Sequence, residues 1–596
     1  MIRKYLPFFV LFVISYVFLQ WFAGGIFFYQ EQKSLFVFST EYLQRHLIRP
    51  GGILKYIAAF ITQGYLSGFF GALINSLIIT LLSILSGSIA KRLSAGSTFS
   101  MPLTFLMPLG VMLCQYDYHF TILHSLGFLT AACLFFLSVT STSKTSRLIL
   151  IILFPVFYFV SGSYSLLYLG MWSAYGIINY RDKDTFVYSV VQIAAALLTI
   201  IVFYNLIFFQ PLKVITGYPF LFNEYGKANL LLYTTSAIFI TYPALIKISS
   251  LLNPEKHSGL ISALLTVLIF GISIFVLIRQ YNPVFEGIMR TEKMFFKGGY
   301  DNIISHHERN PSSNIIEQFY YNLSLSEKGK LCDRMFFGRQ DAGPMSLSLE
   351  GNREQASRTM HYYYAIGLVN EARHLAFELM VNNGYSPENL KMLIKTELIN
   401  GNFRVAARYV NVLKRTLGYR SEAAKFEKML FNPEIVRADP ELGEKMKLMP
   451  EEDFFIHTEE VINIEMLLKS HPRNRKAFEY KMARLLLEKD IIEVAKESVK
   501  MKELGYSSIP RHIEEAIVAW ASYSKAVPDL NGLTVSSETN ERFVNYVQAV
   551  NRFQGDKALI EKSLSKKERN TFWFYLQFGK ISVDFSKSKP ADRNVY

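Results

Sequence analysis

Long apolar segments fill the first half of the chain and constrain its fold more than any other feature. A helix needs about 20 apolar residues to cross the roughly 30 Å hydrocarbon layer of a bilayer. Segments without an Asp, Glu, Lys or Arg reach or nearly reach this length, so residues 1–280 are predicted to form a polytopic helical membrane domain in a lipid bilayer. These segments are residues 5–29, 65–90, 120–139, 186–209, 230–246 and 260–278.

Shorter apolar segments bring the expected number of crossings to about nine. Residues 101–114, 148–160 and 164–180 each lie next to a brief polar break. Such short segments either span where the bilayer is thinned or dip in and return, which requires protein or water to satisfy the backbone. Both alternatives stay open.

Basic residues in the loops give the crossings a direction, because Lys and Arg accumulate on the cytoplasmic side. Arg3 and Lys4 precede the first span and predict a cytoplasmic N-terminus. We expect this span to be a retained signal anchor, since its apolar run is longer than that of a signal peptide. An odd count then places the C-terminal half on the extracytoplasmic side. The first outer loop runs against the rule, with Lys33, Arg45, Arg49 and Lys55.

The composition agrees with a membrane protein and limits other classes. Of 596 residues, 51% are hydrophobic and 15% aromatic, and the mean hydropathy is +0.19. The formal net charge of +14 would suit nucleic acid, but the basic residues occur singly, so we expect no nucleic-acid partner. Cys114, Cys133 and Cys332 lie far apart in the sequence, so neither a disulfide framework nor a zinc site is expected.

The second half, residues 281–580, is charged and periodic and contains an internal repeat. Gly367 and Ala372 match Gly401 and Ala406 at a spacing of about 34 residues, the tetratricopeptide period. In a helical hairpin the Gly closes the first helix and the small Ala lets the second approach it closely. We therefore expect an all-α chain in which a degenerate, tetratricopeptide-like helical-repeat domain follows the membrane domain.

The repeat is irregular outside this pair. Similar hairpins are predicted at residues 314–336 and 474–503. Residues 432–450, with their three prolines, are expected to be an irregular connection, and residues 581–596 a frayed tail. Solenoids of this kind bind peptides or proteins along a concave face, although a rigid spacer for the membrane part is an equal alternative.

Four segments carry a resemblance. Residues 27–32, 320–329, 402–413 and 474–483 resemble those of a family of uncharacterised bacterial multi-pass membrane proteins with a C-terminal tetratricopeptide-like region. The resemblance implies this architecture and a bacterial inner (cytoplasmic) membrane, but no activity and no cofactor. A looser similarity is to the multi-pass glycosyltransferases of the C type, although the paired acidic motif frequent in their first outer loop is absent here.

The ionisable residues expected at the outer face are the candidates for chemistry. A sugar transfer from a lipid-linked donor needs a carboxylate as base and a cation for the leaving phosphate. Glu41, Asp117 or Glu31 would be the catalytic carboxylate, and Arg45 or His119 would bind the phosphate. The alternative is that each residue only fixes a helix end and reaches water. His46 and Glu224 are predicted to share this face.

Other signatures are weak. His306, His307 and Glu308 are adjacent, and since adjacent helical residues point apart, we expect a solvated surface and no metal site. No nucleotide-binding motif is present in the sequence. The leading hypothesis is therefore an accessory envelope protein of unknown activity whose repeat domain binds an envelope protein or peptide. The rival is a C-type glycosyltransferase-like enzyme.

Overall fold

The computed structural model shows an all-helical protein, and every regular element among the described residues is a helix. The chain divides into two compact units. Unit 1 is Met1–Glu286 with Arg415–Gly418, and unit 2 is Gly287–Lys414 with Tyr419–Tyr596. The described residues are 2–94, 98–221, 230–251, 258–349, 355–452, 454–526, 528–553 and 556–580.

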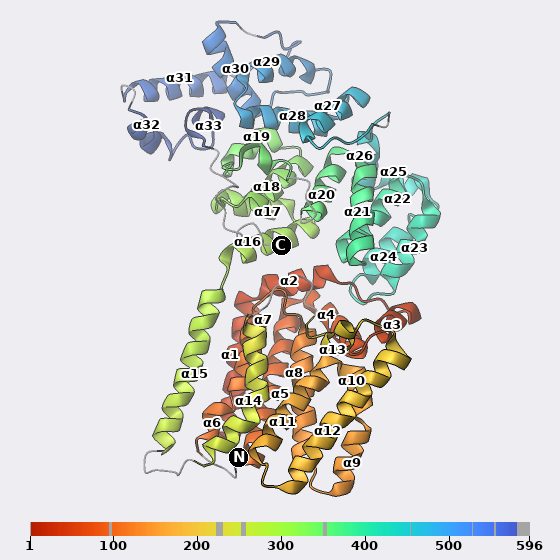
Figure 1. The fold of residues 1–596 in the computed structure, drawn as a ribbon. Helices are drawn as coiled ribbons and strands as arrows, with labels where there is room; N and C mark the ends of the chain where they lie inside the picture. The colour runs from red at the N-terminus through yellow and green to blue at the C-terminus, as the bar shows by residue number, and fades with distance from the viewer. Residues whose placement is uncertain are drawn as a thin grey trace. The chain divides into compact units, whose positions relative to one another are not determined.

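Unit 1 is a bundle of helices, several of them long (Figure 1). Its elements are α1 (Ile2–Phe22), α2 (Gly24–Lys33), α3 (Thr40–Leu47), α4 (Gly52–Thr62), η1 (Gln63–Leu66), α5 (Gly68–Ser94), α6 (Ser100–Leu103), α7 (Leu106–Gln115), α8 (Ile122–Thr140), α9 (Lys144–Ile152), α10 (Phe154–Ser161), α11 (Ser163–Ile178), α12 (Lys183–Val202), the π-helix η2 (Phe203–Phe208), α13 (Leu212–Gly217), α14 (Leu230–Ser249) and α15 (Ser258–Gln280).

Among the described residues, five helices are long and apolar enough to cross a membrane, and up to seven if each of two bent pairs counts as one span. The five are α5, α8, α12 continued by η2, α14 and α15. Fewer helices therefore meet the length criterion than the nine crossings expected. The segment predicted at residues 101–114 lies in a shorter apolar helical stretch, Ser100–Gln115.

The first predicted span is not one straight helix. The structure breaks it after Phe22, and α2 leaves α1 at 71°. Gly24 and Gly25 follow the break. Glycine has a low helix propensity, so a helix bends more easily where glycines occur. Lys144–Ile152 and Phe154–Ser161 form the second bent pair, at 44°.

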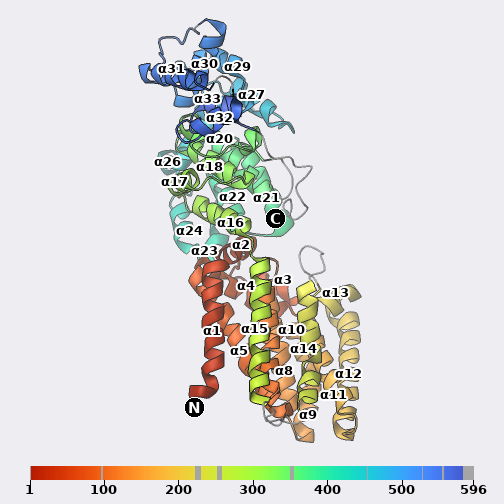
Figure 2. The same ribbon diagram turned by 90° about the vertical axis from the view of Figure 1, so that its left-hand side faces the viewer.

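Helices α1 and α15 run in the same direction (Figures 1 and 2). At one end of the bundle, the ring of Tyr281 lies 5.7 Å from that of Phe22 and 6.4 Å from that of Tyr116. At the opposite end, the Ser262 hydroxyl donates to the Thr98 carbonyl over 2.9 Å. We call these the Tyr116 end and the Thr98 end. The start of α1 and the end of α15 therefore lie at opposite ends of unit 1.

A cluster of buried apolar residues in unit 1 is rich in aromatic rings and runs from Leu54 to Ile246 along the chain. Among the described residues, none of its members belongs to α15. Tyr164 in this cluster is wholly buried, and its hydroxyl lies 2.6 Å from Nδ1 of His124. Only 17% of the apolar stretch of α15 is buried, against 56% for α8. Helix α15 thus packs loosely on a bundle that is already well packed.

Unit 2 contains shorter helices. They are α16 (Pro283–Phe296, which begins in unit 1), α17 (Tyr300–Arg309), α18 (Ile315–Glu327), α19 (Leu331–Arg334), η3 (Met335–Phe337), η4 (Gly343–Ser346), α20 (Ala356–Ile366), α21 (Val369–Asn383), α22 (Pro387–Ile399), α23 (Phe403–Lys414), α24 (Arg420–Glu427), α25 (Pro433–Ala438), α26 (Pro440–Leu448), α27 (Glu460–Ser470), α28 (Arg475–Glu488), α29 (Ile491–Ser498), η5 (Val499–Met501), α30 (Arg511–Ser524), α31 (Ser537–Asn551), α32 (Lys557–Leu564) and α33 (Phe572–Phe578).

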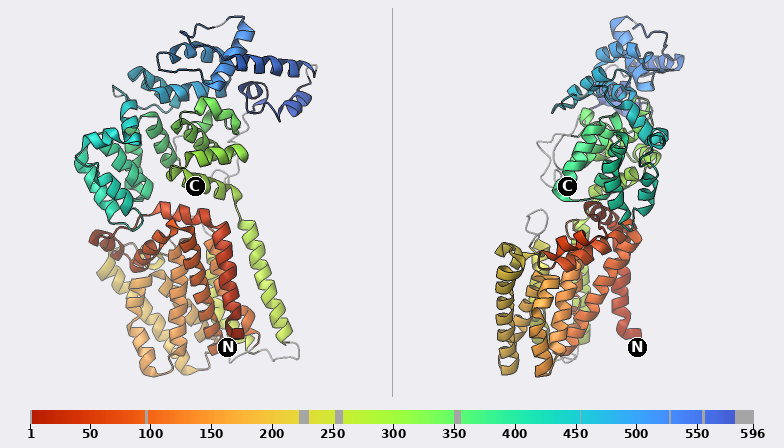
Figure 3. Two further views of the ribbon diagram at one scale, coloured as in Figure 1. Left: turned by 180° about the vertical axis from the view of Figure 1, so that it is seen from behind. Right: turned by 90° about the vertical axis from the view of Figure 1, so that its right-hand side faces the viewer.

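Two helical hairpins, α20 with α21 and α22 with α23, occupy the predicted repeat and are coloured from green to teal in Figure 3. Gly367 ends α20 with φ +99°, and Gly401 ends the turn after α22 with φ +73°. Both φ values lie in the left-handed region that glycine adopts without strain. Ala372 and Ala406 are wholly buried where the paired helices meet. The predicted roles of Gly and Ala are confirmed at these hairpins, whereas a tetratricopeptide-like repeat stays a proposal.

The prediction of an irregular connection at residues 432–450 is wrong, because this segment contains helices α25 and α26. Pro433 and Pro440 instead occupy the first positions of α25 and α26. Proline is tolerated there because the first amides of a helix have no partner within it. The preceding Asn432 and Asp439 accept hydrogen bonds from those amides and so begin each helix.

Candidate functional site

The predicted site residues separate into two groups in unit 1. Glu41 and Arg45 lie on α3 with exposed side chains, and among the described residues neither forms a hydrogen bond or ion pair. Nδ1 of His46 lies 2.8 Å from the Tyr42 carbonyl, and burial lowers the pKa of this imidazole. The α3 group is therefore a polar helix surface. Glu224 lies outside the described residues.

Glu31, Asp117 and His119 lie in a second group at the Tyr116 end. Glu31 is only 4% exposed on α2 and accepts a 2.7 Å hydrogen bond from the Gln32 amide. In the turn between α7 and α8, the His119 backbone N–H donates to Oδ1 of Asp117 over 2.9 Å. Gln30 ties α2 to this turn, since its side-chain amide donates to the carbonyl of Phe120 over 3.0 Å.

A cavity of about 140 Å³ lies between α2, α4 and this turn. Of the site residues predicted from the sequence, His119 lines this cavity. Lys33 from the end of α2 and Lys55 from α4 line it as well. The lining contains two lysines, two histidines and four tyrosines, and none of the described lining residues is an Asp or Glu. The cavity is therefore cationic and rich in hydrogen-bonding groups.

The cations of this cavity lie over tyrosine rings. Lys33 Nζ lies 5.0 Å from the centre of the Tyr29 ring, and Lys55 Nζ lies 5.9 Å from that of Tyr218. Arg49 approaches Tyr218 at 5.6 Å. Contacts of this kind attract a cation by roughly 0.5–1 kcal/mol at exposed sites. Within the described ranges none of the three cations forms an ion pair with a carboxylate.

Sequence reasoning missed the lysines as site residues, although a signal for them was present. Lys33, Arg49 and Lys55 belong to the loop predicted to be the first outer one, whose charge runs against the positive-inside rule. Basic residues on the unexpected side of a membrane indicate a local use for their charge. Tyr218 carried no signal, because it follows Lys55 by more than 160 residues and meets it only in the fold.

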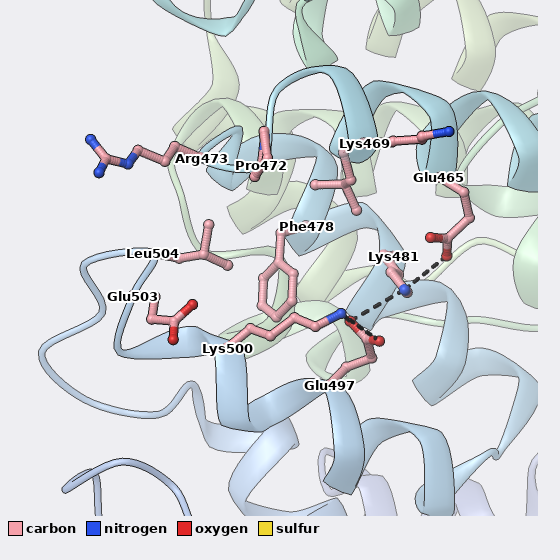
Figure 4. A pocket seen from close by; sticks show the side chains of 11 residues that line it. Glu465, Lys469, Pro472, Arg473, Phe478, Lys481, Glu497, Lys500, Glu503 and Leu504 are labelled. Atoms are coloured by element: carbon pink, nitrogen blue, oxygen red, sulfur yellow. Dashed lines mark hydrogen bonds and ion pairs between the residues drawn. The ribbon is translucent and has the colours of Figure 1, made fainter.

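Unit 2 has a groove of about 650 Å³ between α27, α28 and η5 (Figure 4). The buried ring of Phe478 lies at its centre. On one side Lys481 pairs with Glu465 at 2.8 Å and with Glu497 at 3.2 Å. The groove also carries exposed charged residues that form no ion pair among the described residues. Lys469 lies beside Glu465, and Arg473 and Glu503 lie on the other side of Phe478.

The solvated surface expected at residues 306–308 is wrong for His307. This side chain is 3% exposed, stacks on Tyr321 at 4.6 Å, and burial lowers the pKa of its imidazole to about 4. Glu308 instead pairs with Arg334 at 2.6 Å. Among the described residues, no three His, Cys, Asp or Glu side chains are placed to hold a metal ion.

A bundle with several helices able to span a membrane, followed by a second helical unit, defines a multi-pass helical membrane protein. The chain belongs to a family of unknown function, DUF6057, whose family model matches residues 1–579. No curated protein and no solved structure matches the chain. The uncharacterised family expected from the sequence is confirmed, and the comparisons provide no activity.

Proposed function

We propose that the protein is an accessory protein of the bacterial inner membrane whose unit 2 binds a protein or peptide partner in the cell envelope. The groove around Phe478 carries this proposal (Figure 4). Partner binding is dominated by a few central apolar or aromatic anchors surrounded by polar contacts. The half-buried Leu468 and Leu504 provide an apolar centre over the buried ring of Phe478, and the charged side chains provide the surrounding contacts.

The uncommitted charges of the groove favour binding over a purely structural role. Lys469 and Arg473 are exposed and form no ion pair among the described residues, so a partner carboxylate can pair with them without breaking an existing ion pair. Complementary charges of this kind raise association rates and select partners. The helical hairpins of unit 2 support the same proposal, because stacked hairpins present extended binding surfaces.

The proposed extracytoplasmic side of unit 2 is supported by the direction of the helices. Basic residues collect at the Thr98 end, which is the cytoplasmic end under the positive-inside rule. They are Lys91, Arg92, Lys144, Arg147, Arg181 and Lys183. The end of α15 lies at the opposite end, and unit 2 follows it in the sequence.

The test places a photoreactive amino acid at position 469 of the full-length protein in the native membrane. We expect this residue to capture a cross-linked partner. The same photoreactive amino acid at position 557, in place of Lys557 on α32, should not capture that partner. The partner, once purified, should bind the Lys469→Glu, Arg473→Glu double variant at least tenfold more weakly than the unaltered chain. The matched control, Lys557→Glu with Lys562→Glu, should change affinity less than twofold. Equal cross-linking at both positions would refute the proposal.

A second candidate, transfer of a sugar from a lipid-linked donor, is favoured by one observation. Asp117 lies beside His119, which lines the cationic cavity. Asp117 would serve as the base and His119 would meet the phosphate, while Glu41 and Arg45 lie on the separate α3 surface.

Surface glycans test this second candidate. Deletion of the gene should remove a glycan that a Glu41→Gln variant restores and an Asp117→Asn variant does not. Unchanged glycans after deletion would rule the enzyme out, whatever the result of the cross-linking experiment.

A further inference from the structure

We propose that the cationic cavity at the Tyr116 end binds the phosphate group of a membrane lipid. This binding goes beyond partner binding by unit 2, and it requires no sugar transfer. The site takes a phosphate monoester or diester of a lipid, whose apolar portion lies against the apolar side chains of the cavity lining. The cavity is defined by Lys33, Lys55, His119, Tyr42 and Tyr218.

The charges of the cavity favour an anion. Two ammonium groups line one space of about 140 Å³, and the described lining residues include no carboxylate. Like charges brought together without a counterion repel, and this repulsion is stronger near a low-dielectric bilayer than in water. An anion that accepts hydrogen bonds from both lysines removes the repulsion and forms charge-assisted bonds, which are about twice as strong as neutral ones.

The walls provide neutral donors as well. Tyr42 faces the cavity, and burial raises the pKa of its hydroxyl to about 12, so this group keeps its proton at neutral pH and can donate. Gln30, which is 7% exposed, is held in place by its hydrogen bond to Phe120 and fixes α2 against the turn. A phosphate has oxygens enough to accept from several such donors at once.

The position of the cavity points to a lipid as the source of the phosphate. The turn between α7 and α8 joins two apolar helices, so it lies where the bilayer meets water. The cavity lining also includes apolar side chains, namely Ala58 and Ala59 of α4 and Ile122 and Leu123 of α8. Apolar side chains beside a polar site suit the acyl portion of a lipid.

The size of the cavity limits what enters it. Pockets for drug-sized ligands measure about 300–1,000 Å³. A volume of about 140 Å³ is smaller, so it receives a head group and not a whole nucleotide or sugar nucleotide. The remainder of a lipid would stay outside the cavity.

The test measures binding to the full-length protein in a neutral maltoside detergent. The probes are dihexanoyl phosphatidic acid, inorganic phosphate and dihexanoylglycerol, which together separate the lipid portion from the phosphate. We expect phosphatidic acid to bind most tightly, inorganic phosphate at least tenfold more weakly, and dihexanoylglycerol not at all. Added salt should weaken the binding of phosphatidic acid.

Variants complete the test. Lys33→Gln combined with Lys55→Gln should weaken phosphatidic acid binding at least tenfold, while Lys33→Arg with Lys55→Arg should retain it. Arg279→Gln removes a cation at the same end of the bundle but outside the cavity, and should change affinity less than twofold. Equal affinity of the Gln double variant and the unaltered protein would overturn the site. Inorganic phosphate that binds as tightly as phosphatidic acid would overturn the lipid as its source.

Discussion

Glu479 of α28 is a buried carboxyl whose protonation should affect stability. Its Oε1 accepts a 2.8 Å hydrogen bond from the Leu331 N–H, and burial raises the pKa of the carboxyl to about 7 despite the nearby Lys476. Below pH 4.5 the group is protonated in both the folded and the unfolded chain. Between pH 4.5 and 7 the unfolded chain ionises first, so the free energy of unfolding falls as the pH rises.

The prediction is that Glu479→Gln removes this loss. At pH 8 the variant should exceed the unaltered protein in the free energy of unfolding by up to about 3 kcal/mol, and near pH 4.5 by almost nothing. Thermal unfolding followed by tryptophan fluorescence at both pH values measures the difference. Glu488→Gln, at an exposed ion pair of the same helix, is the control and should show no pH-dependent gain. A variant of Glu479 less stable than the unaltered protein at pH 8 would contradict the prediction.

Single residues also mark the limit of sequence reasoning about the candidate site. His119 was predicted and lines the cavity, whereas Arg45, a cation of the same predicted face, lies on α3 outside it. Which loop cation enters a cavity depends on how α2 and α4 pack, and residue type carries no such information. Lys33 and Lys55 were visible only as an exception to a charge rule.

The two hairpins α20–α21 and α22–α23 each contain a turn glycine, Gly367 and Gly401, and these two glycines can be compared directly. A Cβ at Gly401 would meet nothing within 4 Å, whereas one at Gly367 would lie 2.3 Å from the Leu448 carbonyl oxygen. Both glycines have left-handed backbones, which cost other residues about 1–2 kcal/mol. The contact at Gly367 adds strain of about 1–3 kcal/mol, because a backbone atom must move.

We therefore expect Gly367→Ala to destabilise its hairpin more than Gly401→Ala does. Hydrogen–deuterium exchange of α20 and α22 in the full-length protein gives the free energy of opening of each hairpin. Equal effects of the two substitutions would show that Leu448 does not constrain the first turn.

Helices and turns could be predicted where the sequence pattern that specifies them is local. The long apolar helices and the turn glycines follow from composition and period, and both were predicted. The break after Phe22 was not, because an apolar run looks the same whether it is straight or bent. Pro433 and Pro440 alone predict irregular chain, but a proline preceded by Asn or Asp is equally typical of a helix start, which is what both residues form in the structure.

For the whole molecule, the orientation in the membrane is the main prediction. Replacing the exposed Cys133 with Ala leaves Cys114 and Cys332, which are buried. Single cysteines then replace Thr40 at the Tyr116 end and Thr142 at the Thr98 end, both exposed. A membrane-impermeant maleimide should label position 40 on intact spheroplasts and position 142 only after permeabilisation.

Labelling of Asn402→Cys tests unit 2 in the same experiment, because this exposed residue should react on intact spheroplasts. The reverse pattern at positions 40 and 142 would invert the orientation. Labelling of position 402 only after permeabilisation would place unit 2 in the cytoplasm and would remove the envelope partner from the proposed function.

The loose packing of α15 has a consequence for the order in which the chain is made. The ribosome completes α14 before α15, and the aromatic cluster that runs from Leu54 ends with Ile246 in α14. A nascent chain that has reached this point already contains every described residue of that cluster. Helix α15 is then added to the outside of a bundle that can be complete without it, and Tyr281 reaches Phe22 only as the last of these helices enters the membrane.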